Sequence, residues 1–161
     1  MDLSVKWHPP IALLDGDAHN LIYIAEGLDR WQDVPGVYMF ARVFDGNVHP
    51  LYIGKAESIG GRAWQHFKNN TRLMTSIKKA ARGERVLVPG QFTPKPGQST
   101  KTCIGLIERA LIDHALAEGY ELLNVHGTRT ATHSVQFSGY LGARNLTGQK
   151  LSFKATPKKG T

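Results

Sequence analysis

The sequence predicts an α+β fold with a small antiparallel three-stranded sheet flanked by helices. Residues 37–43 and 51–54 are rich in β-branched and aromatic side chains, and the turn signal Asp45-Gly46-Asn47 separates them, so they predict a hairpin. Residues 86–88, Val-Leu-Val, predict a short third strand. Stretches with helical spacing of apolar residues lie between and after these strands, so the order is hairpin, two helices, strand, helix.

The first 34 residues predict an N-terminal extension that packs on the core. Trp7-His8-Pro9-Pro10 indicates extended or turning backbone. Asp17 is the predicted N-cap of a helix that places Leu21, Ile24 and Leu28 on one stripe. Pro35-Gly36 then marks the start of the core.

Three helices are predicted in the core, which we place at residues 35–125. Residues 60–70 form the first, and Thr71 is the predicted cap of a second that runs to Gly83. The stretch 89–100 is rich in proline and glycine and predicts a loop, and residues 102–118 predict the third helix. Residues 126–161 are a basic C-terminal extension with an irregular or loosely strand-like pattern.

The charge distribution favours a polyanionic partner. The net charge is +7 with a pI of about 9.7. Residues 55–109 hold eleven basic and three acidic side chains, and residues 126–161 hold six basic and no acidic ones. Ordinary solvated surface is the alternative explanation, but two such blocks favour DNA. The candidate backbone-contacting cations are Lys68, Arg72, Lys78, Lys79, Arg82, Arg85, Arg129 and Arg144.

Cysteine content and hydropathy bear on the compartment. Cys103 is the only cysteine, which excludes an intrachain disulfide and suits the cytoplasm. The N-terminus lacks a signal-peptide layout, and no apolar run approaches the ~20 residues of a membrane span. We therefore expect a cytoplasmic protein with no membrane partner.

Two tyrosines and two basic residues surround the predicted hairpin. Tyr38 lies near the start of one strand and Tyr52 near the end of the other, so the hairpin brings them side by side. Arg62 and His66 are four residues apart and share one helix face. Such an Arg can neutralise a phosphate, and such a His can orient or deprotonate a nucleophile. Core tyrosines and a surface Arg and His are the alternative explanation.

Glu108 lies on the apolar side of its predicted helix. At ~100° per residue it falls within the stripe made by Ile104 and Ile107. An ionised carboxylate on an inward face is costly unless it meets a cation or hydrogen-bond donors. A metal ion meets this need, and so does an ion pair with Arg62 or Lys55.

The ordered series of these residues resembles the GIY-YIG nuclease family. Gly36-Val37-Tyr38 and Tyr52-Ile53-Gly54, separated by a hairpin turn, resemble its two-part signature. The step of eight from Gly54 to its Arg is similar to the family spacing, and the resemblance covers about residues 35–125. The further matched positions are Arg62, His66, Glu108 and Asn124. The spacings from Arg62 to Glu108 and on to Asn124 are wider than is usual in the family.

The resemblance implies a GIY-YIG-like fold and a metal-dependent DNA endonuclease. Glu108 would bind Mg²⁺ or Mn²⁺, and Tyr38 would accept a proton from the attacking water with help from Lys55 or His66. Tyr52 would contact the phosphate or orient the water, Arg62 would offset charge at phosphorus, and Asn124 would complete the catalytic set.

The biological role stays open at this point. A restriction-type enzyme, a toxin delivered to other cells, and a repair or mobile-element nuclease all fit the resemblance. A homodimer would suit the cutting of both strands, and no small-molecule cofactor is expected. The alternatives are a non-catalytic nucleic-acid-binding module and an unrelated structural domain.

Overall fold

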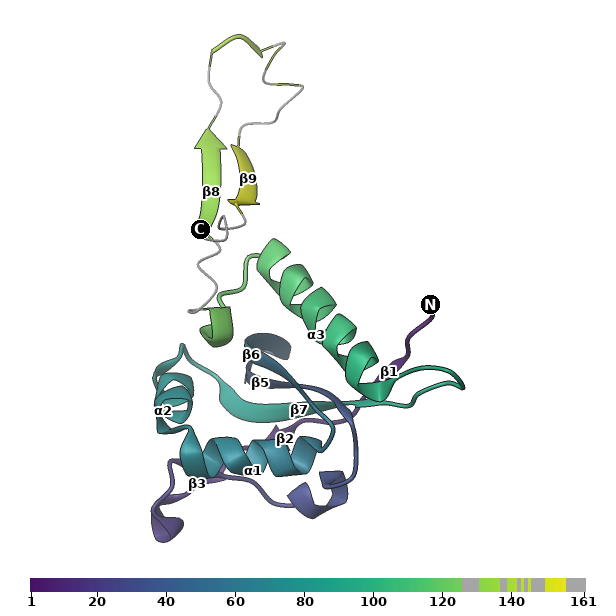
Figure 1. Cartoon of the computed structure of the whole chain (residues 1–161). Coiled ribbons are helices and arrows are strands. Elements are labelled where there is room, and N and C mark those ends of the chain that lie inside the picture. Colours follow the sequence, from purple (N-terminus) through teal and green to yellow (C-terminus); the bar gives the residue numbers. More distant parts are fainter. Residues whose placement is uncertain (126–130, 137–138, 142, 144, 146–149, 156–161) are drawn as a thin grey trace, which may run out of the picture. The chain divides into compact units, whose positions relative to one another are not determined.

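The computed structural model describes residues 1–125, 131–136, 139–141, 143, 145 and 150–155 (Figure 1). The chain divides into two compact units, Met1–Asn124 and Val125–Thr161. Helices and antiparallel sheets are both present, so the fold class is α+β. Within the described residues, no helix has the length and apolar character needed to cross a bilayer.

One antiparallel sheet forms the centre of the first unit. β5 (Gly36–Phe44) lies between β6 (Asn47–Ala56) and β7 (Glu84–Phe92). The far edge of β7 pairs with β1 (Val5–Trp7) and β2 (Ile11–Ala12). The three predicted strands are therefore present and longer than expected. The prediction of a three-stranded sheet is wrong, because the N-terminal segment adds two strands to it.

The β5–β6 hairpin turns on two residues in the left-handed region, Asp45 with φ 54° and Gly46 with φ 76°. Positive φ at both central positions matches the right-handed twist of the strands. The register shifts between Phe40 and Ala41, so the ladder contains a bulge. Pro50 lies directly beyond it on β6, an edge strand, where its missing N–H is tolerated.

Pro89 lies inside β7, so the loop predicted from residue 89 starts too early. Its carbonyl accepts a hydrogen bond from the His8 N–H at 3.0 Å and therefore points toward the N-terminal strands. The nitrogen of Pro89 points to the same side, because the N and O of one residue in an antiparallel strand share a side. This side carries the interruption between β1 and β2, where Pro9-Pro10 lies. The missing donor of Pro89 thus falls where no strand requires it.

Side-chain oxygens cap the N-termini of the three α-helices of the first unit. Ser58 caps α1 (Ile59–Asn69), and Ser99 caps α3 (Thr100–Ala117). α2 (Thr71–Lys79) is capped by Asn70, whose Oδ1 accepts from the Leu73 N–H at 3.2 Å. The prediction of Thr71 as this cap is wrong by one residue. The Asn70 backbone N–H bonds the His66 carbonyl, so the same residue ends α1 and starts α2.

The helix predicted after Asp17 is absent, and its place is taken by short elements. Asp15 Oδ1 accepts from the Asp17 N–H, Asn20 has φ 60° and Gly27 has φ 77°. These turn contacts and left-handed residues interrupt an α-helix before its second turn. The elements are β3 (Leu14–Asp15), η1 (Asp17–His19), β4 (Tyr23–Ile24) and η2 (Leu28–Trp31).

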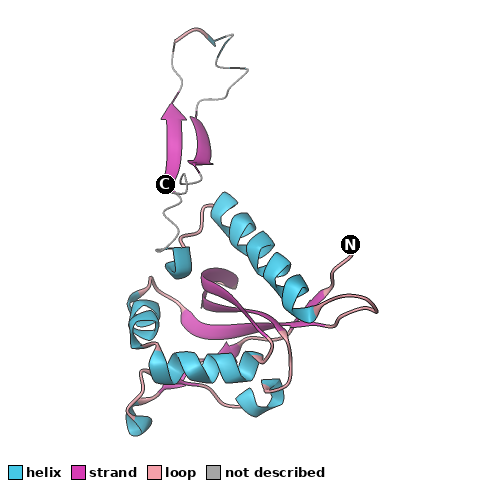
Figure 2. Ribbon diagram, in the orientation of Figure 1, coloured by secondary structure: helices cyan, strands magenta, loops and turns pink. Residues whose placement is uncertain are grey.

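The two faces of the sheet bury different side chains. Tyr38 and Phe40 lie on the face that packs against α1 and α2, within the main core. Met39 and Ala41 point to the other face and pack with Val86 and Val88 of β7. Figure 2 shows α1 and α2 on one side of the strands and α3 on the other. The strand alternation therefore assigns Tyr38 to the same face as α1.

In the second unit, β8 (Ala131–Gln136) pairs antiparallel with β9 (Lys150–Ala155). This hairpin agrees with the strand-like pattern expected for part of the C-terminal extension.

Candidate active site

The two tyrosines lie on one face of the hairpin. Tyr38 is opposite Gly54 and Tyr52 is opposite Phe40, so the phenols are diagonal neighbours. Their ring centroids are 6.3 Å apart with an interplanar angle of 27°. Tyr38 is only 1% exposed, whereas Tyr52 is half-buried. Tyr52 is therefore the phenol with more access to solvent.

The glycines of the two triplets make room for this arrangement. A Cβ on Gly54 would lie 2.5 Å from both Cζ and the hydroxyl of Tyr38, so the phenol lies directly across this glycine. Gly36 has φ 156°, and a Cβ there would collide with the carbonyl of Gly90 on β7. Gly54 thus admits the Tyr38 ring, and Gly36 allows β7 to approach β5.

His66 projects from α1 into the aromatic cluster. Its Nε2 lies 2.8 Å from the Tyr38 hydroxyl, and its Nδ1 lies 3.2 Å from Nδ2 of Asn70. Its ring lies 5.6 Å from that of Phe40 and 5.3 Å from that of Tyr52, between centroids. Burial, reinforced by the Arg62 charge, lowers the pKa of His66 to about 4. The imidazole is therefore neutral at physiological pH.

Glu108 reaches the free edge of β6 from α3. The backbone N–H of Lys55 donates a hydrogen bond to its carboxylate. The side chain is half-buried, and this burial raises its pKa, while the Lys55 and Arg62 charges and the backbone N–H oppose the rise. A carboxylate in this position is stabilised by positive charge and lacks full hydration.

Asn124 binds the same free edge of β6, at Ile53, two residues before Lys55. Its Nδ2 donates to the Ile53 carbonyl at 2.7 Å, and its Oδ1 is buried without a hydrogen-bond partner. Alternate residues of a strand direct their backbone groups to the same side, so Ile53 and Lys55 both face outward. Glu108 and Asn124 therefore cover adjacent positions of one strand edge.

The charges of the cluster act on both phenols. Burial raises the pKa of Tyr38 far above its ordinary value, and Tyr52 and Glu108 add to the rise while Arg62 opposes it. Burial also raises the pKa of Tyr52, but a hydrogen bond from Tyr38 and the Arg62 charge oppose the rise. Arg62 itself is exposed on α1. It thus joins the cluster electrostatically while its guanidinium stays open to solvent.

Lys55 is the member of the candidate site that lies next to α3. Its side chain is exposed, and a Cβ on Gly105 would lie 3.2 Å from its Nζ, so the amine lies over this glycine of α3. The sequence-predicted set of Tyr38, Tyr52, Lys55, Arg62, His66 and Glu108 is thus coupled by hydrogen bonds or charge. Asn124 lies on the same strand edge.

Arg85 differs from the other predicted DNA-contacting cations. Its Nε donates to the Ile77 carbonyl at 2.8 Å, and its terminal nitrogens donate to the carbonyls of Ala80 and Gly83 at 2.6 and 2.8 Å. The guanidinium therefore binds the C-terminal end of α2, which gives Arg85 a structural role, and its contact with DNA stays a prediction. Lys68, Arg72, Lys78, Lys79 and Arg82 are exposed. Arg129 and Arg144 lie outside the described residues.

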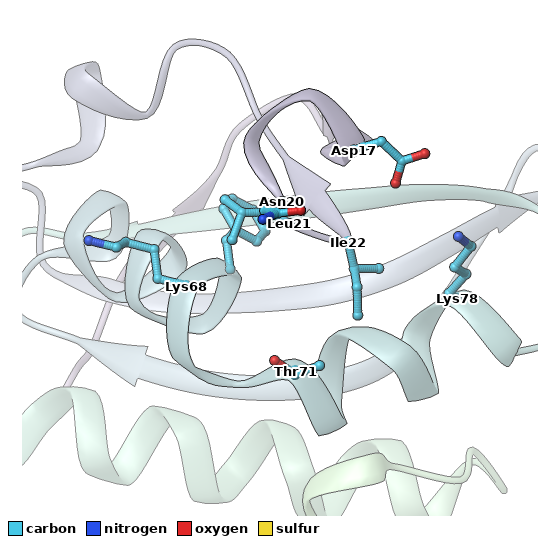
Figure 3. A pocket seen from close by; sticks show the side chains of 8 residues that line it. Asp17, Asn20, Leu21, Ile22, Lys68, Thr71 and Lys78 are labelled. Carbon is cyan, nitrogen blue, oxygen red and sulfur yellow. The ribbon is translucent and has the colours of Figure 1, made fainter.

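A separate hollow of about 300 Å³ lies between the N-terminal segment and the α1–α2 junction (Figure 3). Lys68 and Lys78 line it together with Asp17 and Asn20. None of the candidate catalytic residues lines this hollow, so it is distinct from the cluster around Tyr38.

The described residues contain no group of three or more His, Cys, Asp or Glu side chains arranged to hold a metal ion. The comparisons with known proteins give no relative, because no family model, curated protein or solved structure matches the chain.

Sequence reasoning missed Asn70. Its side chain bridges the cap of α2 and the ring of His66. Two signals in the sequence could have revealed it. An Asn between two helical stretches is a strong N-cap signal. Asn70 also follows His66 by four residues, a spacing at which the two side chains can meet.

Proposed function

We propose that this protein is a metal-dependent DNA endonuclease of the GIY-YIG type, which hydrolyses phosphodiester bonds. The observation that carries the proposal is the coupling of Tyr38 to His66 at 2.8 Å and to the charges of Arg62 and Glu108. Tyr38 comes from β5, and Glu108 comes from α3. The other two residues both come from α1. The coupling gathers phenol, imidazole, guanidinium and carboxylate, a set suited to an attack on a phosphate ester.

Arg62 is the candidate phosphate-binding residue. Its charge affects the pKa values of Tyr38, Tyr52, His66 and Glu108, although its side chain is exposed. A guanidinium that is open to solvent and next to a buried cluster can bind a phosphate in a bidentate fashion. Negative charge that develops on the phosphorus oxygens would be stabilised there.

The residues present fit Mg²⁺ or Mn²⁺ held by one carboxylate. Glu108 is half-buried with a raised pKa, so a cation would stabilise its ionised form. Among the described residues no group of three or more His, Cys, Asp or Glu side chains is arranged to hold a metal ion, so DNA phosphate oxygens would supply further ligands. When bound, the ion would supply Lewis-acid stabilisation of the leaving 3′ oxygen.

One of the two tyrosines would accept the proton of the attacking water. As the water oxygen bonds to phosphorus and the bond to the 3′ oxygen breaks, the water proton passes to a phenolate oxygen. Tyr52 is the member that meets solvent, and Tyr38 is the member held by His66. Both pKa values are raised, so the phenolate requires the positive charges of the site. Lys55 and Arg62 supply part of that charge.

DNA would follow the exposed cations of α1 and α2. Lys68, Arg72, Lys78 and Lys79 are exposed, and phosphate contacts by such residues give affinity without base specificity. The biological role that we propose for it is of the restriction type or the toxin type. We place the protein in the cytoplasm if it is a restriction enzyme, and outside the producing cell if it is a toxin. Pairs of active sites in a homodimer would cut both strands.

Incubation with supercoiled plasmid tests the proposal. We expect nicked or linear DNA in the presence of Mg²⁺ or Mn²⁺, intact plasmid in EDTA, and no cutting by Glu108→Ala. Plasmid binding without cutting in any metal would favour the non-catalytic nucleic-acid-binding module. Neither binding nor cutting would leave the cluster as packing within a structural domain.

A further inference from the structure

We propose that Asn70 is a positioning residue that makes His66 a hydrogen-bond donor to Tyr38 and thereby removes His66 from the possible general bases. The catalytic meaning of this inference rests on the proposed function. The direction of the hydrogen bonds stands on the geometry alone.

The orientation of the Asn70 amide follows from its role as the cap of α2. Its Oδ1 lies 3.2 Å from the backbone nitrogen of Leu73. A backbone N–H can only donate, so the amide oxygen must face Leu73. The amide NH₂ group then faces Nδ1 of His66 at 3.2 Å. The backbone holds this residue on both sides, because its N–H bonds the His66 carbonyl and its carbonyl accepts from the Met74 N–H.

The amide orientation determines the tautomer of His66. An amide NH₂ donates and cannot accept, so Nδ1 of His66 must be the acceptor and carries no hydrogen. The ring is neutral, because burial lowers its pKa to about 4, and it therefore holds one N–H. That N–H is on Nε2, which lies 2.8 Å from the Tyr38 oxygen. His66 thus donates to Tyr38.

This direction separates the roles of the two residues. The hydrogen of the Tyr38 hydroxyl must point away from His66, because Nε2 has no free lone pair in this tautomer. His66 therefore cannot take a proton from Tyr38 or from a water at that position. Its N–H instead stabilises negative charge on the Tyr38 oxygen, which offsets part of the burial that disfavours the phenolate. The proton acceptor of the site is then a phenolate oxygen, which the N–H of the imidazole stabilises.

The substitution Asn70→Asp reverses this direction with little change in shape. Aspartate is as good an N-cap as asparagine, so one oxygen still accepts from Leu73. The second oxygen is an acceptor, so His66 must then carry its hydrogen on Nδ1 and present Nε2 as an acceptor. Asn70→Ser is the matched control, since serine also caps helices but its short side chain does not prescribe the tautomer.

Nitrogen-15 NMR of the histidine ring at about pH 8, where neutral imidazole dominates, reads the tautomer directly. We expect the native His66 to carry its hydrogen on Nε2 and the Asn70→Asp variant to carry it on Nδ1. A native ring protonated on Nδ1, or a folded Asn70→Asp variant with an unchanged tautomer, would overturn the proposal. Circular dichroism establishes that each variant is folded.

A cleavage assay tests the catalytic meaning separately. We expect Asn70→Asp to lower kcat by about 10–100-fold with little change in KM, and Asn70→Ser to lower it less. A reversed tautomer with undiminished cleavage would overturn the catalytic role of Asn70. If the native protein cuts no DNA in any metal, the proposed function fails, while the NMR result still decides the hydrogen-bond direction.

Discussion

The hydroxyl of Tyr38 lies 2.8 Å from Nε2 of His66, and the two residues are 28 positions apart in the chain. The contact forms because strand alternation turns Tyr38 toward α1 and because Gly54 leaves space for its ring. The free energy of unfolding should therefore depend on protonation of His66 and on small changes in the volume of the side chains around Tyr38.

The free energy of unfolding should fall as the pH is lowered from about 6.5 toward 4. The pKa of folded His66 is about 4, below the ordinary histidine value of about 6.5, so in this window the unfolded chain binds more protons. The stabilising effect of a neutral His66 is complete above this window and is lost as the pH falls through it. The change is at most ~3 kcal/mol.

Urea denaturation at several pH values measures this slope. Glu108 acts in the opposite direction, because a raised pKa favours folding at low pH and loses that effect as the pH rises. Comparison of the native protein with His66→Gln isolates the histidine. An equal slope in both proteins would contradict the assignment.

Arg85→Ala should destabilise the fold by about 1–3 kcal/mol, because the carbonyls at the end of α2 lose their charged donor. Arg85→Lys should recover only part of the loss, since an ammonium cannot reproduce the planar fork. Arg82→Ala is the control, because Arg82 is exposed and the hydrogen bond that its backbone carbonyl accepts from Arg42 remains in the variant. Thermal unfolding that ranks Arg82→Ala as the more harmful variant would refute this role.

Gly54→Ala should destabilise the fold by about 1–3 kcal/mol, because the new Cβ would force the phenol of Tyr38 out of its position. The cost should shrink when Tyr38 is first replaced by Ala, since the collision is with the end of that ring. A double-mutant cycle of unfolding free energies measures this coupling. Additive effects of the two substitutions would show that Gly54 is needed for another reason.

The exposed cations of α1 and α2 should give a salt-dependent affinity for duplex DNA. Each of Lys68→Ala, Arg72→Ala and Lys79→Ala should weaken binding across sequences and lower the salt slope by about one unit. Fluorescence anisotropy titrations at several salt concentrations measure the slope. Lys6→Ala, on β1, is the control and should leave the slope as it is. Equal salt slopes for all four variants would contradict the proposal that DNA lies along α1 and α2.

The sequence allowed much of the core to be predicted, because its signals are local. The Asp45-Gly46 turn lies between two apolar strands, and the apolar stripe of α3 predicts that Glu108, which is half-buried, faces the sheet at β6. These features depend on residues that are neighbours along the chain. The fold class and the order of the central elements follow from them.

The remaining features depend on contacts that only folding creates. The apolar spacing after Asp17 suggested a helix, but Asn20 and Gly27 adopt left-handed conformations that end it. The partners of Arg85 are carbonyls at the end of α2, a structural contact that its position within a basic block does not reveal. The pairing of the N-terminal strands with β7 joins segments about 80 residues apart, which no local pattern records.

The cleavage rate of Glu108→Gln compared with Glu118→Gln tests the nuclease proposal most directly. Glu118 is exposed at the end of the same helix, so its substitution controls for the loss of one acidic charge. Under single-turnover conditions with Mg²⁺ and a labelled DNA duplex, Glu108→Gln should cut at least about 100-fold more slowly than Glu118→Gln, which should match the native protein. Equal rates for the two variants would contradict the proposal that the carboxylate at the β6 edge takes part in hydrolysis.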